Sequence, residues 1–80
     1  MRISVILFGI ARDIVGDKTL TLEVPEKGDV AELKRLIVQK FPAFNSLNHL
    51  AIAVNNEYAS NSQILEISDE IALIPPVSGG

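Results

Sequence analysis

The chain has 80 residues, 48% of them apolar, and a formal net charge of −3, which is the size of one small domain. It contains no cysteine and one histidine, so disulfides, thiolate-bound metals and a cysteine–histidine catalytic pair are excluded. There is no basic cluster suited to nucleic acid, no apolar run long enough to span a membrane and no signal-peptide pattern at the N-terminus, so we expect a cytoplasmic protein.

The first third of the chain predicts an antiparallel hairpin. Residues 3–8 are β-branched and apolar, which is typical of a strand. Its inward residues would be Ile3, Val5 and Leu7. Residues 11–15 are expected to form one helical turn, and Gly16 with Asp17 predicts a turn. Residues 18–24 then alternate in polarity, which indicates a second strand. Its inward residues would be Leu20, Leu22 and Val24. The short connection favours antiparallel pairing.

A helix is expected next. Asp29 suits the N-cap, and Glu32 three residues later completes a capping box. Apolar residues then repeat at helical spacing, namely Val30, Leu33, Ile37 and Phe41. Pro42 ends the helix at about Phe41. The basic residues of this segment fit its solvated face, and they are Lys34, Arg35 and Lys40.

The second half predicts shorter elements. Residues 43–49 are expected to form a loop, 50–54 a third strand, 55–57 a turn, 58–59 the start of a short strand and 70–74 the last strand. The helix must cover one face of the sheet, because its apolar stripe needs a partner. With the last strand beside the first, we predict an α+β β-grasp fold, as in ubiquitin. It would have a mixed four- to five-stranded sheet with one main helix packed on one face.

Strand parity predicts an apolar surface on the open face of this sheet. The mean hydropathy of +0.30 is high for so small a domain, which favours either a rich core or apolar surface left for a partner. If the core-facing residues alternate as expected, Phe8, Ile6 and Ile74 point outward near the end of the last strand. We assign them, with Tyr58 of the short strand, to a partner-binding surface. The alternative, that a loop covers them, stays open.

We expect no catalytic or metal site within the domain. His49 lies in a polar loop, where a lone histidine is usually solvated. The serines form no nucleophile elbow, and the glycines before residue 30 form no phosphate-cradling pattern. Several carboxylates occur at element ends, where caps and turns explain them: Asp13, Asp17, Asp69 and Glu70. Any chemistry is therefore expected at the C-terminus.

The chain ends Pro75-Pro76-Val77-Ser78-Gly79-Gly80. The two prolines fix their own φ angles and hold Ile74 extended, whereas glycine has no side chain and bends freely. We therefore expect a domain over residues 1–76 and a flexible tail over 77–80 that can thread a narrow channel and present its carboxylate. A frayed terminus without a role is the alternative.

A carboxylate is inert toward nucleophiles at neutral pH, so it must first become an activated acyl group such as an acyl-adenylate. Because the chain has no nucleotide motif, another enzyme would supply that step. The activated carbonyl could accept an amine, a thiol or sulfide. Without cysteine, the chain could carry sulfur only as a terminal thiocarboxylate.

Residues 72–80, Ala-Leu-Ile-Pro-Pro-Val-Ser-Gly-Gly, resemble the C-terminal signature of the molybdopterin synthase small subunit family of ubiquitin-like sulfur carriers. Phe8 with Arg12-Asp13-Ile14-Val15-Gly16 resembles the early segment of that family, and Val54-Asn55 followed by Asp69-Glu70-Ile71 resembles a later one. The resemblance spans essentially the whole chain. One departure is Ser68, where the family usually has glycine, so the local turn is expected to differ.

The resemblance implies a non-catalytic subunit of a sulfurtransferase complex that binds no cofactor or metal. An adenylating enzyme would use ATP to activate Gly80, a sulfur donor would convert it to a thiocarboxylate, and the tail would enter the large subunit. There sulfur would pass to cyclic pyranopterin monophosphate, within a heterotetramer of two small and two large subunits. The alternatives are a sulfur carrier for thiamine or tRNA thiolation and a ubiquitin-like protein modifier, which would form an isopeptide bond.

Overall fold

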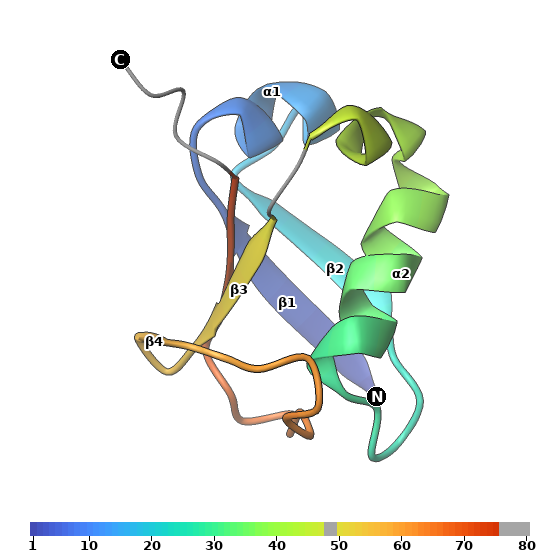
Figure 1. The fold of residues 1–80 in the computed structure, drawn as a ribbon, viewed down its shortest axis with the longest axis vertical. Coiled ribbons are helices and arrows are strands. Elements are labelled where there is room, and N and C mark those ends of the chain that lie inside the picture. The colour runs from blue at the N-terminus through green and yellow to red at the C-terminus, as the bar shows by residue number, and fades with distance from the viewer. Residues whose placement is uncertain (48–49, 76–80) are drawn as a thin grey trace.

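The computed structural model describes residues 1–47 and 50–75 and shows a mixed sheet crossed on one face by one main helix (Figure 1). The sheet has five strands in the order β2-β1-β5-β3-β4. In chain order the elements are β1 (Arg2–Leu7), α1 (Ile10–Val15), β2 (Thr19–Glu23), α2 (Val30–Lys40), a 3-10 helix η1 (Pro42–Ser46), β3 (Ala51–Val54), β4 (Glu57–Tyr58) and β5 (Ile71–Ile74). The predicted order of elements is confirmed.

Strands β1 and β2 pair antiparallel, with Ser4 opposite Thr21 near the centre of the ladder. The first strand begins and ends one residue earlier than predicted, so Phe8 lies just beyond it. The reason is Gly9, whose φ of +56° turns the chain away from the sheet. The predicted inward residues are all buried: Ile3, Val5, Leu7, Leu20, Leu22 and Val24.

The last strand lies at the centre of the sheet. It pairs parallel to β1, with Ile6 opposite Ala72, and antiparallel to β3, with Ile52 opposite Leu73. The prediction that the last strand lies beside the first is therefore confirmed.

Helix α2 begins and ends where the sequence predicts. The Asp29 carboxylate accepts a hydrogen bond from the Glu32 backbone N–H at 2.9 Å. Only this half of the expected capping box forms, because the Glu32 carboxylate accepts from Arg35 in the next turn. The helix ends at Lys40, before Pro42. It packs on the sheet through buried residues, which are Val30, Leu33 and Ile37.

The prediction of a loop at residues 43–49 was wrong for its first half, since Pro42–Ser46 forms a 3-10 helix. Proline suits the first position of a helix because its φ is already helical. Phe44 anchors this segment, because its side chain is fully buried and its ring meets the Phe41 ring edge-on at a centroid distance of 6.3 Å. His49 lies outside the described residues.

Two turns shape the end of the sheet that carries β4. Asn55 and Asn56 both have positive φ, 54° and 69°, which is the conformation of a tight two-residue hairpin turn. Around Ser68, the Asp69 N–H donates to the Glu66 carbonyl at 3.0 Å, and the Glu66 N–H donates to the Asp69 carboxylate at 2.8 Å. Ser68 is not among the residues with positive φ, so serine fits this turn without strain.

Candidate functional site

The chain leaves the sheet at Pro75, which is buried beside Gly9. A Cβ built on Gly9 would lie 3.6 Å from Pro75 Cγ, an ordinary van der Waals contact. The loop after β1 therefore supports the residue from which the C-terminal segment departs. The remaining predicted tail residues lie outside the described part of the chain: Pro76, Val77, Ser78, Gly79 and Gly80.

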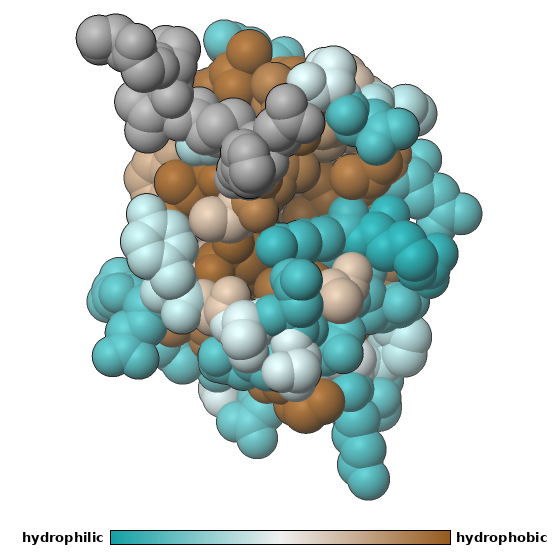
Figure 2. Space-filling view, viewed as in Figure 1, coloured by the Kyte–Doolittle hydropathy of each residue, from teal (hydrophilic) through white to brown (hydrophobic). Residues whose placement is uncertain are grey.

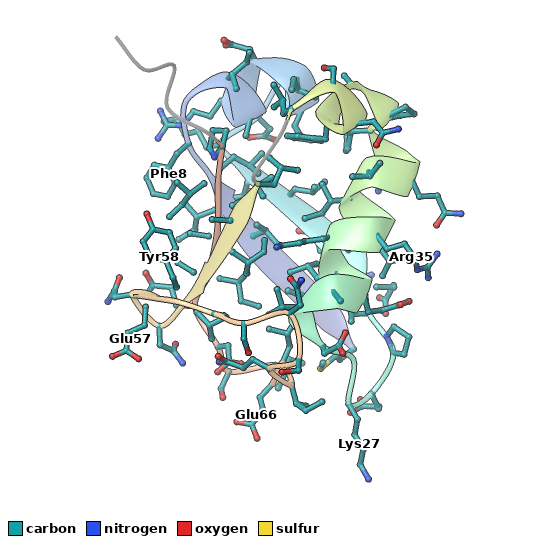
Figure 3. The ribbon with its side chains drawn as sticks, viewed as in Figure 1. Phe8, Lys27, Arg35, Glu57, Tyr58 and Glu66 are labelled. Carbon is teal, nitrogen blue, oxygen red and sulfur yellow. The ribbon has the colours of Figure 1, made fainter. Side chains whose placement is uncertain are left out.

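The structure brings the four predicted partner-binding residues together. Ile6, Phe8, Tyr58 and Ile74 line one hollow of about 280 Å³ on the face of the sheet opposite α2, together with Ala53, Asn56, Glu70 and Ala72. We call this surface the open-face hollow. Phe8 is 44% exposed and Tyr58 75%, and the side chains of both point away from α2 (Figure 3). The predicted placement is confirmed, whereas the partner-binding role stays a prediction.

Strand register explains why this surface is hollow. Ile6 lies opposite Ala72, Ala72 opposite Ala53, and Ala53 opposite Tyr58. These four residues form one row across β1, β5, β3 and β4. Because alanine is small, the middle of the row is a floor between two large side chains. This floor could not be predicted from the sequence, since it depends on pairing between distant segments.

Arg12 places a positive charge beside the hollow. Its Nε donates a hydrogen bond to the Leu7 carbonyl oxygen at 2.9 Å, and its guanidinium carbon lies 5.9 Å from the centre of the Phe8 ring. This is a cation–π arrangement. Arg12 therefore supports the exposed Phe8 ring from the side of α1. The sequence pattern singled out Arg12 only as part of a motif, and its contacts required the structure.

One end of the hollow, where Phe8 and Ile74 lie, is at the more apolar end of the molecule. Figure 2 shows hydrophobic surface concentrated where β5 ends, whereas the opposite end is mostly hydrophilic. Such a surface is typical of a protein-binding site.

The described residues hold no group of three or more histidine, cysteine or acidic side chains placed to bind a metal. Nor does any of their helices have the length and apolar character needed to cross a membrane. The hydrogen bond from Arg35 lowers the pKa of Glu32, but this exposed pair lies on α2, away from the hollow. The site therefore combines apolar surface with one carboxylate in its lining, Glu70, and one cation beside it, Arg12.

The model of the ThiS family matches residues 5–80. The molybdopterin synthase sulfur carrier subunit of Caenorhabditis briggsae is 40% identical, and the alignment covers 98% of this chain and 96% of the relative. The subunit of the same name from Arabidopsis thaliana is 37% identical, over 100% of this chain and 84% of the relative.

Two solved structures are informative. SAMP1 from Haloferax volcanii superposes with a TM-score of 0.84 at 27% identity over 100% of both chains. A complex of subunits 1 and 2 of molybdopterin-converting factor from Helicobacter pylori contains a chain that matches with a TM-score of 0.65 at 29% identity, again over 100% of both. These likenesses confirm the predicted β-grasp, ubiquitin-like fold.

Proposed function

The chain belongs to the ThiS family, among the molybdopterin synthase sulfur carrier subunits, and we propose that it carries sulfur as a thiocarboxylate on Gly80. The proposed acceptor is cyclic pyranopterin monophosphate, from which the molybdopterin dithiolene is built. The chain itself binds no cofactor and supplies the sulfur, while its partner enzymes supply the catalysis.

The main support for this proposal is that the C-terminal segment begins directly beside the open-face hollow. Ile74 lines the hollow, and Pro75 follows it directly. A protein docked on the hollow is therefore next to the point where the chain leaves the sheet. Five residues follow Pro75, and an extended segment of that length reaches at most about 17 Å. That reach is enough to enter a cleft in the docked protein.

The proposed chemistry has three steps. The Gly80 carboxylate attacks the α-phosphate of ATP on an adenylating enzyme, which forms an acyl-adenylate and releases pyrophosphate. Sulfur at the oxidation level of hydrosulfide then displaces AMP and leaves a thiocarboxylate. In the large subunit this sulfur attacks a side-chain carbon of the pterin precursor and displaces an oxygen substituent from it. Water then hydrolyses the resulting thioester, which leaves the sulfur on the pterin and regenerates the Gly80 carboxylate.

Assembly with a large subunit is part of the proposal. In Helicobacter pylori, subunit 1 and subunit 2 of molybdopterin-converting factor form a complex. We propose the same kind of pairing here, in a heterotetramer of two small and two large subunits, with the open-face hollow as the contact surface. The adenylating enzyme would use this hollow in its turn, so the two partners would exclude each other. The sulfur donor is a third partner, and neither nucleic acid nor membrane takes part.

A second candidate function is protein modification. The likeness to SAMP1, a small archaeal modifier protein, favours it, because an isopeptide bond would start from the same activated glycine. A carrier for thiamine or tRNA thiolation is a third possibility that the ThiS family match leaves in place. Both would use Gly80, but with a different acceptor.

Intact-protein mass spectrometry after incubation with the adenylating enzyme, ATP and a sulfide source tests the proposal. A sulfur carrier gains the mass difference between sulfur and oxygen, and only in the presence of ATP. A protein modifier would instead be detected as species of higher mass, in which the chain is joined to a lysine of another protein. Adding the large subunit and the pterin precursor then distinguishes the proposed carrier from a carrier for thiamine or tRNA thiolation, because only the proposed carrier yields molybdopterin.

A further inference from the structure

The two edges of the sheet differ in how much backbone they leave free. At one edge, β4 has two residues. At the other edge, β2 has five, Thr19–Glu23, and contains neither proline nor lysine. Proline, lysine and short length are the usual ways in which natural proteins prevent an edge strand from pairing with another chain. Strand β2 uses none of these three, and its one charged residue, Glu23, lies at its end.

The hydrogen-bond pattern shows which groups of β2 point outward. The Leu7 N–H donates to the Lys18 carbonyl at 2.9 Å, and the Val24 N–H donates to the Met1 carbonyl at 2.8 Å. In an antiparallel ladder, bonded and non-bonded residues alternate. The residues directed toward β1 are therefore even-numbered, so the backbone N–H and carbonyl groups of Thr19, Thr21 and Glu23 point away from the sheet.

A groove of about 600 Å³ runs beside these groups, lined by Arg2, Thr21, Leu22, Glu23 and Lys40. Leu22 is almost fully buried and supplies an apolar wall. Lys40 is the last residue of α2, so the groove extends from the outer edge of β2 to the C-terminal end of the helix. An extended peptide would find both backbone partners and side-chain contacts here.

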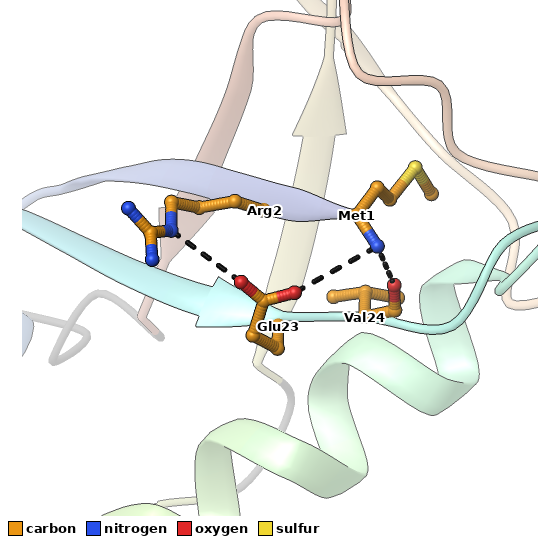
Figure 4. A network of polar contacts seen from close by, with 4 residues as sticks. All are labelled: Met1, Arg2, Glu23 and Val24. Carbon is orange, nitrogen blue, oxygen red and sulfur yellow. Dashed lines mark hydrogen bonds and ion pairs between the residues drawn. The ribbon is translucent and has the colours of Figure 1, made fainter.

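The charges of the groove are divided between its two sides. On the open-face side, Arg2 Nε lies 3.4 Å from the Glu23 carboxylate, and the N-terminal amino group lies 3.8 Å from it (Figure 4). On the helix side, Lys40 is exposed and is not among the basic groups that form ion pairs within the described residues. The helix side of the groove therefore favours a negative charge.

We propose that the free edge of β2 binds an extended segment of a partner protein, which adds a strand to the sheet and places a carboxylate beside Lys40. The outward groups of Thr19, Thr21 and Glu23 supply the backbone hydrogen bonds. This interaction is separate from the sulfur chemistry of Gly80.

A second copy of this chain fits less well. Two β2 strands paired edge to edge would place Leu20 and Leu22 of the second copy on the helix side, because these residues face the core. Neither offers a carboxylate to Lys40. The charge of the groove therefore favours an acidic segment of another protein.

The β2 edge and the open-face hollow can be occupied at the same time. The hollow spans β1, β5, β3 and β4, whereas the groove is lined by β2, by Arg2 at the start of β1 and by Lys40, and the two share no lining residue. A partner bound at β2 would keep the carrier tethered while the hollow and the C-terminus pass from one enzyme to the next.

The test uses the full chain, labelled with nitrogen-15, and two eight-residue peptides. One alternates valine with glutamate, and the other alternates valine with lysine. The acidic peptide should slow hydrogen exchange and shift the amide signals of Thr19, Thr21 and Glu23, while the amide of Ala72 beneath the hollow stays unchanged. Methylating alternate backbone nitrogens of the acidic peptide should weaken binding about tenfold, since it removes the hydrogen-bond donors.

Two variant pairs provide matched controls. Thr21→Pro removes one outward N–H at a position where edge strands accept proline. It should weaken binding of the acidic peptide about tenfold, whereas Thr21→Val should leave that binding unchanged. Lys40→Glu should weaken it similarly, whereas Lys34→Glu, with the same charge change on the same helix, should not. If Thr21→Pro unfolds the domain, the methylated peptide still provides the test.

Three results would overturn the proposal. One is equal binding of the acidic and basic peptides, or no binding of either at millimolar concentration. Another is that methylation of the peptide backbone does not weaken binding. The third is protection of the β2 amides that rises with protein concentration in the absence of peptide, which would assign the edge to a second copy.

Discussion

The Arg12 guanidinium lies over the ring of Phe8, with 5.9 Å between the guanidinium carbon and the ring centre. Phe8 is 44% exposed and lies just beyond the end of β1, so the ladder does not hold it. Arg12, tied by its Nε to the Leu7 carbonyl oxygen, therefore gives this ring a held contact beside the hollow.

Replacing Arg12 with alanine should weaken the binding of the large subunit, because Phe8 loses its support and the surface loses a cation. The expected loss is about tenfold in affinity, with a stability cost of about 1 kcal/mol. Titration calorimetry and a thermal melt measure the two effects. Arg35→Ala is the control, since its exposed ion pair with Glu32 contributes little. Unchanged affinity in Arg12→Ala would remove Arg12 from the docking surface.

Charged substitutions should distinguish the two faces of the sheet. Ile74→Asp and Phe8→Asp should weaken partner binding more than tenfold and leave the fold intact, because both side chains lie on the open face. Their neighbours Leu73 and Leu7 are fully buried, so Leu73→Asp and Leu7→Asp should unfold so small a domain. Circular dichroism with a pull-down of the large subunit measures both properties. An unfolded Phe8→Asp variant would mean that this face is wrongly assigned.

Removing Gly80 should abolish sulfur transfer and leave the melting temperature unchanged. Among the described residues, Leu73 is the last of the buried hydrophobic core and Pro75 is the last buried residue, and terminal residues beyond a core usually contribute little to stability. A thermal melt of the truncated chain, run beside a sulfur-transfer assay, checks both expectations. Sulfur transfer by the truncated chain would rule out Gly80 as the carrier.

The shape of the C-terminal segment should affect activation and sulfur transfer more than its polarity does. Gly79→Val should impair activation or transfer more than Ser78→Ala does, because a β-branched side chain stiffens and widens the segment that enters a partner. The rates of thiocarboxylate formation and of sulfur release should be measured separately for both variants. Equal rates would argue against passage through a narrow channel.

Much of the fold could be predicted because its signals are local. The alternation of Leu20, Leu22 and Val24 gives the face of β2, and Asp29 begins α2 by capping it. The 3-10 helix could not be predicted from periodicity, because five residues are too few to show a repeat. The spacing of Phe41 and Phe44, three residues apart, was the available clue, since the two rings pack together in the structure.

The hollow was predictable only in part. Parity placed Ile6, Phe8 and Ile74 on one face, because alternation along a strand is a local property. The alanine floor at Ala72 and Ala53 depends on the register between β5 and β3, which no local pattern gives. The contacts of Arg12 likewise depend on how α1 folds back on β1.

The stoichiometry of sulfur transfer is the sharpest test of whether Gly80 is the sulfur carrier. One carboxyl terminus holds one sulfur, and the chain has no cysteine to hold another, whereas a dithiolene requires two. Single-turnover reactions should combine purified thiocarboxylated carrier, the large subunit and limiting pterin precursor, with no other sulfur source, and should follow product formed against carrier supplied. We expect two carriers to be consumed for each molybdopterin, with a mono-sulfurated intermediate between the two transfers. One carrier per product, or product formed without the thiocarboxylate, would contradict transfer from Gly80.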